Sequence, residues 1–225
     1  MCDAFHDVMA SSGGVLDGSG PLVVAFAEVW RRLSQGASAE WIDRTARHWD
    51  WYFDAYAEEA DNRAHRRIPT VEEHFALRRK SGFVYAMIDL SQKAHGFELP
   101  RHAYDDPVLR HMLDITADVV DTLNDVHSVE KEESRGDLHN LVLTIERESG
   151  CGRRESIARI QRLIDDWGRE FLEHERVLLD GAGRDGPVLR PSITSSSAVS
   201  CGPLGLALVL VLRPPLDRLR KVVGA

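Results

Sequence analysis

The stretch "PVLRHMLDITADVVDTLNDVHSVEKEES", residues 107–134, decides the fold of this chain. Pro107 suits the first turn of a helix, because the N–H that proline lacks has no partner there. Side chains suited to a core then recur every three or four positions: Leu109, Met112, Leu113, Thr116, Val119, Val120 and Leu123. A helix of this length with one apolar face is stable when that face packs against other helices. The stretch therefore predicts a long core helix in an all-α protein.

The sequence on both sides of this stretch also has helical periodicity. Ser38 can cap the helix that follows it, and Thr70 with Glu73 forms a capping-box pair. We expect a break at Ser81-Gly82 between two further helices. The expected helices cover about residues 22–33, 39–65, 71–81, 83–95, 137–148 and 154–180. Because no series of alternating segments bounded by turns occurs, a sheet is not expected.

Composition divides the chain into three parts. Residues 1–20 are rich in Gly, Ser and Asp and predict an N-terminal loop, and residues 21–180 form the helical domain. Residues 181–225 hold five of the nine prolines and are expected to be poorly ordered. Their longest apolar run, 204–212, is nine residues, whereas a membrane span needs roughly 20. This change of composition indicates either an unrelated end, such as a shifted reading frame, or an ordinary linker with a short helix.

The overall composition excludes several classes of protein. Hydrophobic residues make up 43% of the chain, too many for a disordered protein and too few for a membrane bundle. The net charge of −8 argues against a nucleic-acid-binding surface. Cys2, Cys151 and Cys201 form neither a disulfide framework nor a zinc-binding spacing, and the first residues do not resemble a signal peptide. We therefore expect a cytoplasmic protein; a homodimer stays open as an assembly.

A line of polar residues continues the apolar face of the long helix. Asn124, Ser128 and Glu132 are spaced four residues apart and fall on one helix face. Their amide, hydroxyl and carboxylate oxygens suit Mg²⁺. Eight residues rise about 12 Å, so Glu132 must turn back toward the start of the helix. Lys131 and Arg135 lie beside the line and would suit an anionic ligand such as a diphosphate.

The same residues have a simpler interpretation. Lys131 and Arg135 would then pair with Glu130, Glu132 and Glu133 at a solvated helix end, with no ligand involved. From composition alone this interpretation is favoured.

A resemblance changes that balance. The pattern Asn124-Asp125-x-x-Ser128-x-x-x-Glu132 resembles the NSE Mg²⁺-binding motif of bacterial class I terpene synthases. Those enzymes have an arginine that senses the diphosphate 46 positions before the asparagine, and that position is Arg78 here. The resemblance covers about residues 22–179.

The resemblance implies a class I terpenoid synthase helical bundle that is incomplete in this chain. In the family, a linker and an effector residue follow the arginine by three and four positions, which are Ser81 and Gly82 here. The backbone carbonyl of Gly82 would point at a carbocation, and Arg78, Lys131 and Arg135 would bind the diphosphate. Mg²⁺ would be the cofactor. Three aromatic residues are candidates for the cavity wall: Phe75, Phe83 and Tyr85.

The sequence departs from the family at both ends. The family's aspartate-rich motif would fall ahead of Met1, and its C-terminal Arg-Tyr pair is absent, since the last tyrosine is Tyr104. Two hypotheses follow. The chain is a terpene synthase that cyclises an isoprenoid diphosphate, with farnesyl diphosphate as the expected substrate, or it is an inactive truncated relative that at most binds diphosphate and Mg²⁺. A plain helical scaffold is a third, weaker alternative.

Overall fold

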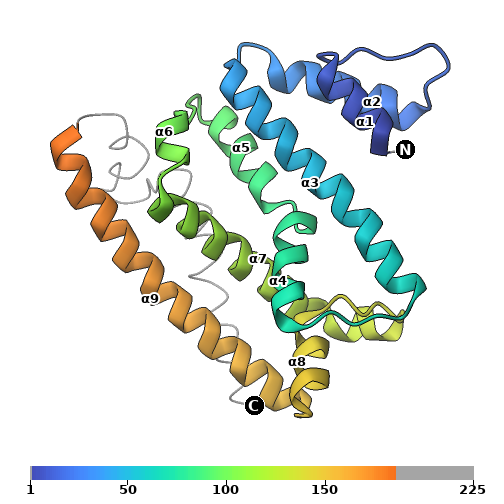
Figure 1. The fold of residues 1–225 in the computed structure, drawn as a ribbon, viewed down its shortest axis with the longest axis vertical. Coiled ribbons are helices and arrows are strands. Elements are labelled where there is room, and N and C mark those ends of the chain that lie inside the picture. The colour runs from blue at the N-terminus through green and yellow to red at the C-terminus, as the bar shows by residue number, and fades with distance from the viewer. Residues whose placement is uncertain (1, 186–225) are drawn as a thin grey trace.

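The computed structural model of the chain describes residues 2–185, and these residues form helices joined by loops without any strand (Figure 1). The helices are α1 (Cys2–Ala10), α2 (Pro21–Ser34), α3 (Ala39–Ala64), α4 (Val71–Ser81), α5 (Val84–Ala94), α6 (Arg101–Tyr104), α7 (Pro107–Ser134), α8 (Leu141–Ser149) and α9 (Arg153–Asp185). The predicted all-α fold is confirmed.

Local capping sets most of the helix starts. The Ser38 side chain accepts a hydrogen bond from the backbone of α3 at 3.1 Å. Thr70 Oγ1 accepts from the Glu73 N–H, and a Glu73 carboxylate oxygen accepts from the Thr70 N–H, which completes the capping box of α4. Asp106 caps α7 by accepting from two backbone N–H groups. Sequence analysis predicted the caps at Ser38 and Thr70, because they need only a few neighbouring residues, but it did not identify Asp106 as a cap.

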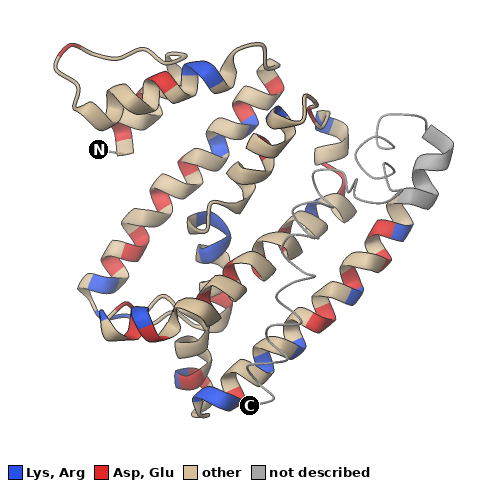
Figure 2. Ribbon diagram, turned by 180° about the vertical axis from the view of Figure 1, so that it is seen from behind, with Lys and Arg blue, Asp and Glu red and all other residues tan. Residues whose placement is uncertain are grey.

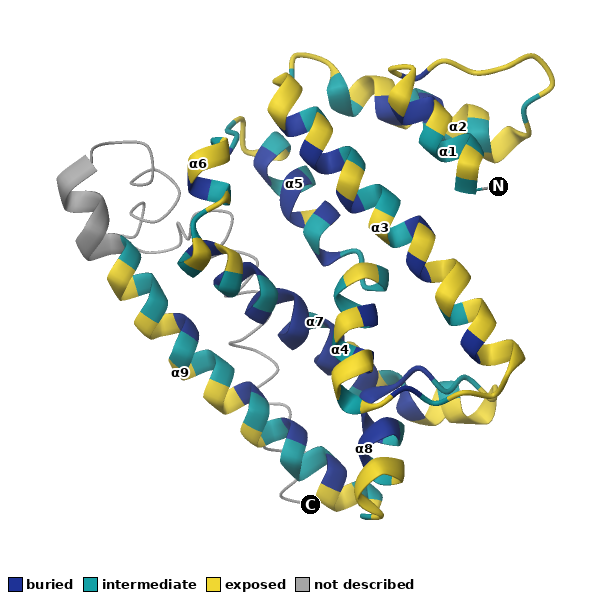
Figure 3. Ribbon diagram, viewed as in Figure 1, coloured by how far each residue is buried: buried dark blue, intermediate teal, exposed yellow. Residues whose placement is uncertain are grey.

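Helix α7 is the centre of the molecule. It contacts α4, α5, α8 and α9, and Figure 3 shows it buried along most of its length. Helices α4 and α5 lie between α3 and α7, while α9 runs along the other side of α7 (Figure 1). The main core forms where α7, α8 and α9 meet, around Ile115, Val119, Leu141, Ile160 and Ile164.

Three expectations about helix boundaries are wrong, and one short helix was not expected. Part of the predicted loop over residues 1–20 is helix α1, because Val8 and Met9 are buried in a second core with Trp30 and Phe53. Helix α8 begins at residue 141, not about 137, because the Asn140 side chain caps it. Helix α9 continues through 181–185, and the short helix α6 was not expected. The remaining predictions for the tail fall at 186–225, outside the described residues.

A buried polar network joins α3 to α5. Arg44 Nε lies 3.2 Å from one carboxylate oxygen of Asp89, and His48 Nδ1 lies 2.5 Å from the other. Arg44 also donates to the Gln92 side chain and to the backbone carbonyl of Leu99. Since all these side chains are buried, the two helices are held in one relative position.

Charged residues of both signs are interspersed along the outer sides of α3 and α9 (Figure 2). Across residues 2–185, no helix has the length and apolarity to cross a membrane.

Candidate functional site

The structure brings Arg78 of α4 into direct contact with Asn124 of α7. Arg78 Nη2 donates a hydrogen bond of 2.9 Å to Asn124 Oδ1, across a separation of 46 residues. The same guanidinium donates to Asp125 from Nε at 3.1 Å and from Nη2 at 2.8 Å. Arg78, the expected diphosphate-sensing arginine, therefore lies next to Asn124, the first residue of the expected metal motif.

Asp125 of α7 connects three helices, because it binds side chains of α4 and the backbone at the start of α8. It is fully buried, and its carboxylate accepts from His74 Nε2 on α4 at 2.9 Å and from the Leu141 N–H of α8 at 2.8 Å. Burial alone would raise the pKa of Asp125, but the hydrogen bond from His74 and the charge of Arg78 outweigh burial and lower it. Asp125 is therefore ionised and holds Arg78 in position.

Asn140 turns the Glu132 side chain back toward the start of α7. Its buried amide nitrogen donates to the backbone carbonyl of Asp125 at 2.7 Å and to a Glu132 carboxylate oxygen at 2.8 Å. The Asn140 carbonyl oxygen meanwhile accepts from the Val142 N–H and caps α8. Sequence analysis missed Asn140, although its position directly before an apolar run is a capping signal.

Ser128 lies between Asn124 and Glu132 and has an unsatisfied hydroxyl. Its Oγ is buried without a hydrogen-bond partner among the described residues. A buried hydroxyl of this kind costs free energy unless a ligand or water completes it. Glu132 is half-buried, whereas Asn124 is exposed. The three residues of the expected polar line therefore differ in burial, with Asn124 exposed and Ser128 and Glu132 partly buried. The oxygen donors of this line and the unsatisfied hydroxyl fit a hard divalent cation.

Lys131 and Arg135 are exposed at the end of α7, and neither makes an ion pair with any residue in 2–185. Two of the three carboxylates expected to neutralise them are engaged elsewhere, Glu132 with Asn140 and Glu133 with Arg153, and Glu130 forms no ion pair with either cation. The salt-bridged helix end of the simpler interpretation is therefore not formed.

The expected helix break is present and strained. Helix α4 ends at Ser81, and Gly82 is its C-cap. Phe83 then has φ = 63°, a left-handed conformation that is costly for a residue with a side chain. Its ring is held against Trp49 and Tyr52 of α3, with centroid distances of 4.6 and 4.7 Å.

A buried carboxylate lies directly against this break. A Cβ added to Gly82 would overlap the carboxylate of Asp121, so only glycine fits here. Asp121 is 4% exposed, and its Oδ2 has no hydrogen-bond partner among the described residues. Burial raises the pKa of Asp121 to about 8, against the opposing charge of Arg78. Sequence analysis missed it, although a signal existed: aspartates at 114, 118, 121 and 125 share one face of α7.

The three candidate wall residues lie in different places. Tyr85 lines a pocket of about 240 Å³ together with His48, Trp51 and Tyr104, and its hydroxyl donates to Asp114. Arg78 and the polar line of α7 are not part of that pocket. Phe83 packs at the strained break.

Phe75 belongs to the main core instead of a cavity wall. Its ring packs edge-on against Trp167 of α9 at 5.6 Å between centroids. The sequence periodicity of a short helix such as α4 indicates which side is buried. It does not indicate which other helix packs against each aromatic side chain.

Comparison with known proteins shows the family to which the chain is similar. The model of terpene synthase family 2, C-terminal metal binding, matches residues 1–170. The matched segment begins at residue 1 and so includes both α1 and α2. The similarity to the family therefore begins before residue 22, where the resemblance noted in the sequence began. Pentalenene synthase from Streptomyces arenae is 40% identical over 170 residues, which are 75% of this chain and 50% of that protein.

Other relatives have related descriptions. A protein from Streptomyces viridochromogenes described as 7-epi-alpha-eudesmol synthase ((2E,6E)-farnesyl diphosphate cyclizing) is 37% identical over 176 residues, 74% of this chain and 51% of that protein. Linalool/nerolidol synthase from Streptomyces clavuligerus has a similar structure, with a TM-score of 0.77, 28% identity, and coverage of 82% of this chain and 64% of that one.

The chain thus spans about half the length of the curated relatives that it matches. Because the matched segment runs from α1 through Arg78, α7 and α8 into α9, the chain belongs to the terpene synthase family.

Proposed function

We propose that this chain acts on an isoprenoid diphosphate as a class I terpene synthase: it ionises the allylic diphosphate and cyclises the prenyl chain, with Mg²⁺ as the metal. Farnesyl diphosphate is the expected substrate, because a relative at 37% identity is described as cyclising it. The observation that carries the proposal is the hydrogen bond between Arg78 and Asn124, two residues that 46 positions separate.

Arg78 would bind the diphosphate at this point. A guanidinium can offer two parallel N–H donors to a phosphate, and Asp125 holds this one by its Nε and Nη2 groups, which leaves Nη1 for a ligand. Lys131 and Arg135 add two exposed cations that form no ion pair with a described carboxylate. Together these groups provide positive charge for an anionic leaving group.

Asn124, Ser128 and Glu132 would hold the metal, whose chemistry when bound is to neutralise the negative charge of the departing diphosphate. Asn140 contributes by holding the Glu132 carboxylate in its turned-back position at 2.8 Å. The unsatisfied Ser128 hydroxyl has a partner only when a ligand or water occupies the site.

The Gly82 break would face the carbocation that ionisation leaves. A helix C-terminus ends in carbonyl groups that have no intrahelical partner and carry partial negative charge. Such groups stabilise a nearby cation without reacting with it. The aromatic rings packed on Phe83 supply apolar, electron-rich surface beside the same break.

Binding and turnover are tested separately on the full chain. Calorimetry with inorganic diphosphate, with and without Mg²⁺, measures binding, and incubation with farnesyl diphosphate and Mg²⁺ followed by hydrocarbon analysis measures turnover. Metal-dependent binding with hydrocarbon products is the expected result. Binding without products would favour the alternative, a relative that holds diphosphate without cyclising it. Absence of metal-dependent binding would contradict both.

A further inference from the structure

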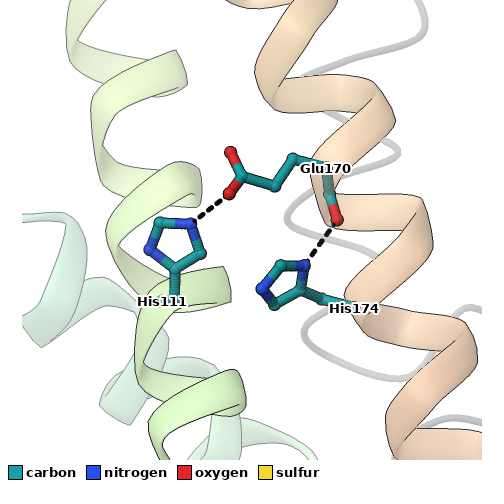
Figure 4. Close-up of side chains that lie close together, drawn as sticks. All are labelled: His111, Glu170 and His174. Atoms are coloured by element: carbon teal, nitrogen blue, oxygen red, sulfur yellow. Dashed lines mark hydrogen bonds and ion pairs between the residues drawn. The ribbon is translucent and has the colours of Figure 1, made fainter.

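Two histidines and a glutamate meet between α7 and α9, far from the diphosphate site. His111 lies in the second turn of α7, and Glu170 and His174 lie one turn apart on α9 (Figure 4). Thirteen residues separate His111 from Asn124 along α7, which is about 20 Å at the helical rise. The cluster is therefore independent of the polar line at the other end of the helix.

The three side chains point toward one another across the two helices (Figure 4). His111 Nε2 lies 2.8 Å from Glu170 Oε1, and the two imidazole rings are 5.1 Å apart between centroids. One ligand atom from each residue lies within 4.8 Å of the other two. Among residues 2–185 this is the one group of three or more histidine, cysteine or carboxylate side chains placed in this way.

The geometry points to a binding site for a divalent transition-metal ion, with Zn²⁺ as the best match: we propose that His111, Glu170 and His174 bind Zn²⁺ and link α7 to α9. Two imidazoles and one carboxylate are a donor set that zinc proteins use, and a fourth position then remains for water. Mg²⁺ prefers oxygen donors only, so the cluster and the polar line of α7 select different ions.

A backbone contact already prepares His174 as a ligand. Its Nδ1 lies 2.8 Å from the backbone carbonyl oxygen of Glu170. Because a carbonyl oxygen only accepts, Nδ1 carries the proton and Nε2 keeps its lone pair for a metal. For His111 to bind the metal through Nε2, the ion takes the place of the proton on that nitrogen, and the neutral imidazole then carries its one proton on Nδ1.

The distances require only side-chain movement. Tetrahedral coordination with bonds of about 2.0–2.1 Å places ligand atoms about 3.3 Å apart. The present limit of 4.8 Å closes by rotation of side chains that are not packed in the core, since His111 and Glu170 are 43% and 44% exposed. The same exposure leaves the fourth position open to water.

A metal here would strengthen a weak part of α9. Among the α9 side chains that the structure describes, which end at residue 178, the last deeply buried one is Phe171, while Leu172 and Val177 are 62% and 49% exposed. Between Phe171 and Leu178, which packs against the core, the described part of α9 has few apolar contacts, and a bond from His174 to α7 would hold it. Binding to the folded state alone raises the melting temperature by mass action.

The test uses the full chain, freed of metal with a chelator and kept in excess Mg²⁺ to fill the oxygen-donor site. Calorimetry with Zn²⁺ is expected to give one site, and Zn²⁺ at about 100 times its Kd should raise the melting temperature by roughly 5–10 °C. Co²⁺ is expected to give the visible spectrum of a four-coordinate ion without a thiolate charge-transfer band.

His111→Gln and His174→Gln are each expected to lower Zn²⁺ affinity by about 100-fold. Glu170→Gln, which can still accept the hydrogen bond from His111, should lower it as well. His95→Gln is the matched control, because His95 makes the same Nδ1 contact to the carbonyl four residues earlier but has no partner ligands.

Three results would overturn the proposal: unchanged Zn²⁺ affinity in both histidine variants, a thiolate band that places the ion on cysteine, or loss of binding in His95→Gln alone. Circular dichroism of each variant checks folding, and the Co²⁺ spectrum of the native chain is independent of any variant.

Discussion

Asp121 is the residue whose charge state depends most on the fold. Its pKa is 3.8 as a free side chain and about 8 in the folded chain, because it is buried. Between these values the folded protein holds one proton more than the unfolded chain. This contribution to stability is therefore complete at acid pH and is lost as the pH rises from about 4 to 8, by up to about 1.4 kcal/mol per pH unit.

Asp121→Asn should remove this slope, since an amide does not ionise. We expect the free energy of unfolding in urea to fall less between pH 5 and pH 8 in the variant than in the native chain. Asp43→Asn, at an exposed position on α3, is the control and should keep the native slope. Parallel pH profiles for Asp121→Asn and the native chain would show that Asp121 is ionised throughout.

The substitution Glu132→Gln removes the negative charge of this side chain while keeping its shape. A glutamine oxygen can still accept the hydrogen bond from Asn140, so Glu132→Gln should leave the melting temperature within about 2 °C of the native value. The lost negative charge should weaken metal-dependent diphosphate binding by about 100-fold or more. Calorimetry measures this binding. A large fall in melting temperature with unchanged diphosphate binding would mean that Glu132 serves the fold alone.

At the scale of elements, the break between α4 and α5 can lie close to α7 because Gly82 has no side chain. Gly82→Ala would place a methyl group on the Asp121 carboxylate, and we expect a loss of about 1–3 kcal/mol in stability. The double variant Gly82→Ala with Asp121→Ala should recover part of this loss, with a coupling of about 0.5–3 kcal/mol.

Gly168→Ala on α9 is the matched control for that cycle. No atom lies within 4 Å of an added Cβ there, so alanine should stabilise the helix by up to about 1 kcal/mol. Thermal unfolding measures all four variants. Additive effects of Gly82→Ala and Asp121→Ala would mean that the break moves away from α7 without cost.

At the scale of the whole molecule, Asp89 holds α3 and α5 together from within. Asp89→Asn would leave Arg44 buried with a weaker partner, and we expect a loss of about 3–5 kcal/mol in urea unfolding. Asp105→Asn removes an exposed partner of Arg101 and should change stability by less than about 0.5 kcal/mol. Similar effects of both substitutions would show that burial of the network adds nothing.

The sequence by itself determined the long helices and most of their boundaries, but not α1 or α6. Capping at Ser38 and Thr70 and the periodicity of α7 act within one or two turns of the chain, so they can be predicted from neighbouring residues. The closeness of Arg78 and Asn124 was also expected, but only from resemblance to a family, since nothing local relates positions 46 apart.

Only the tertiary structure decided which side chains meet across helices. Helix α1 is stable because Val8 and Met9 pack against residues of α2 and α3. Asp121 is buried because its carboxylate packs directly against Gly82 at the end of α4. Asn140 reaches Glu132, and His111 reaches Glu170, across loops or helices that sequence spacing does not measure. The physical reason is range: capping and periodicity are local, whereas burial, pKa and ligand geometry depend on helix packing between distant residues.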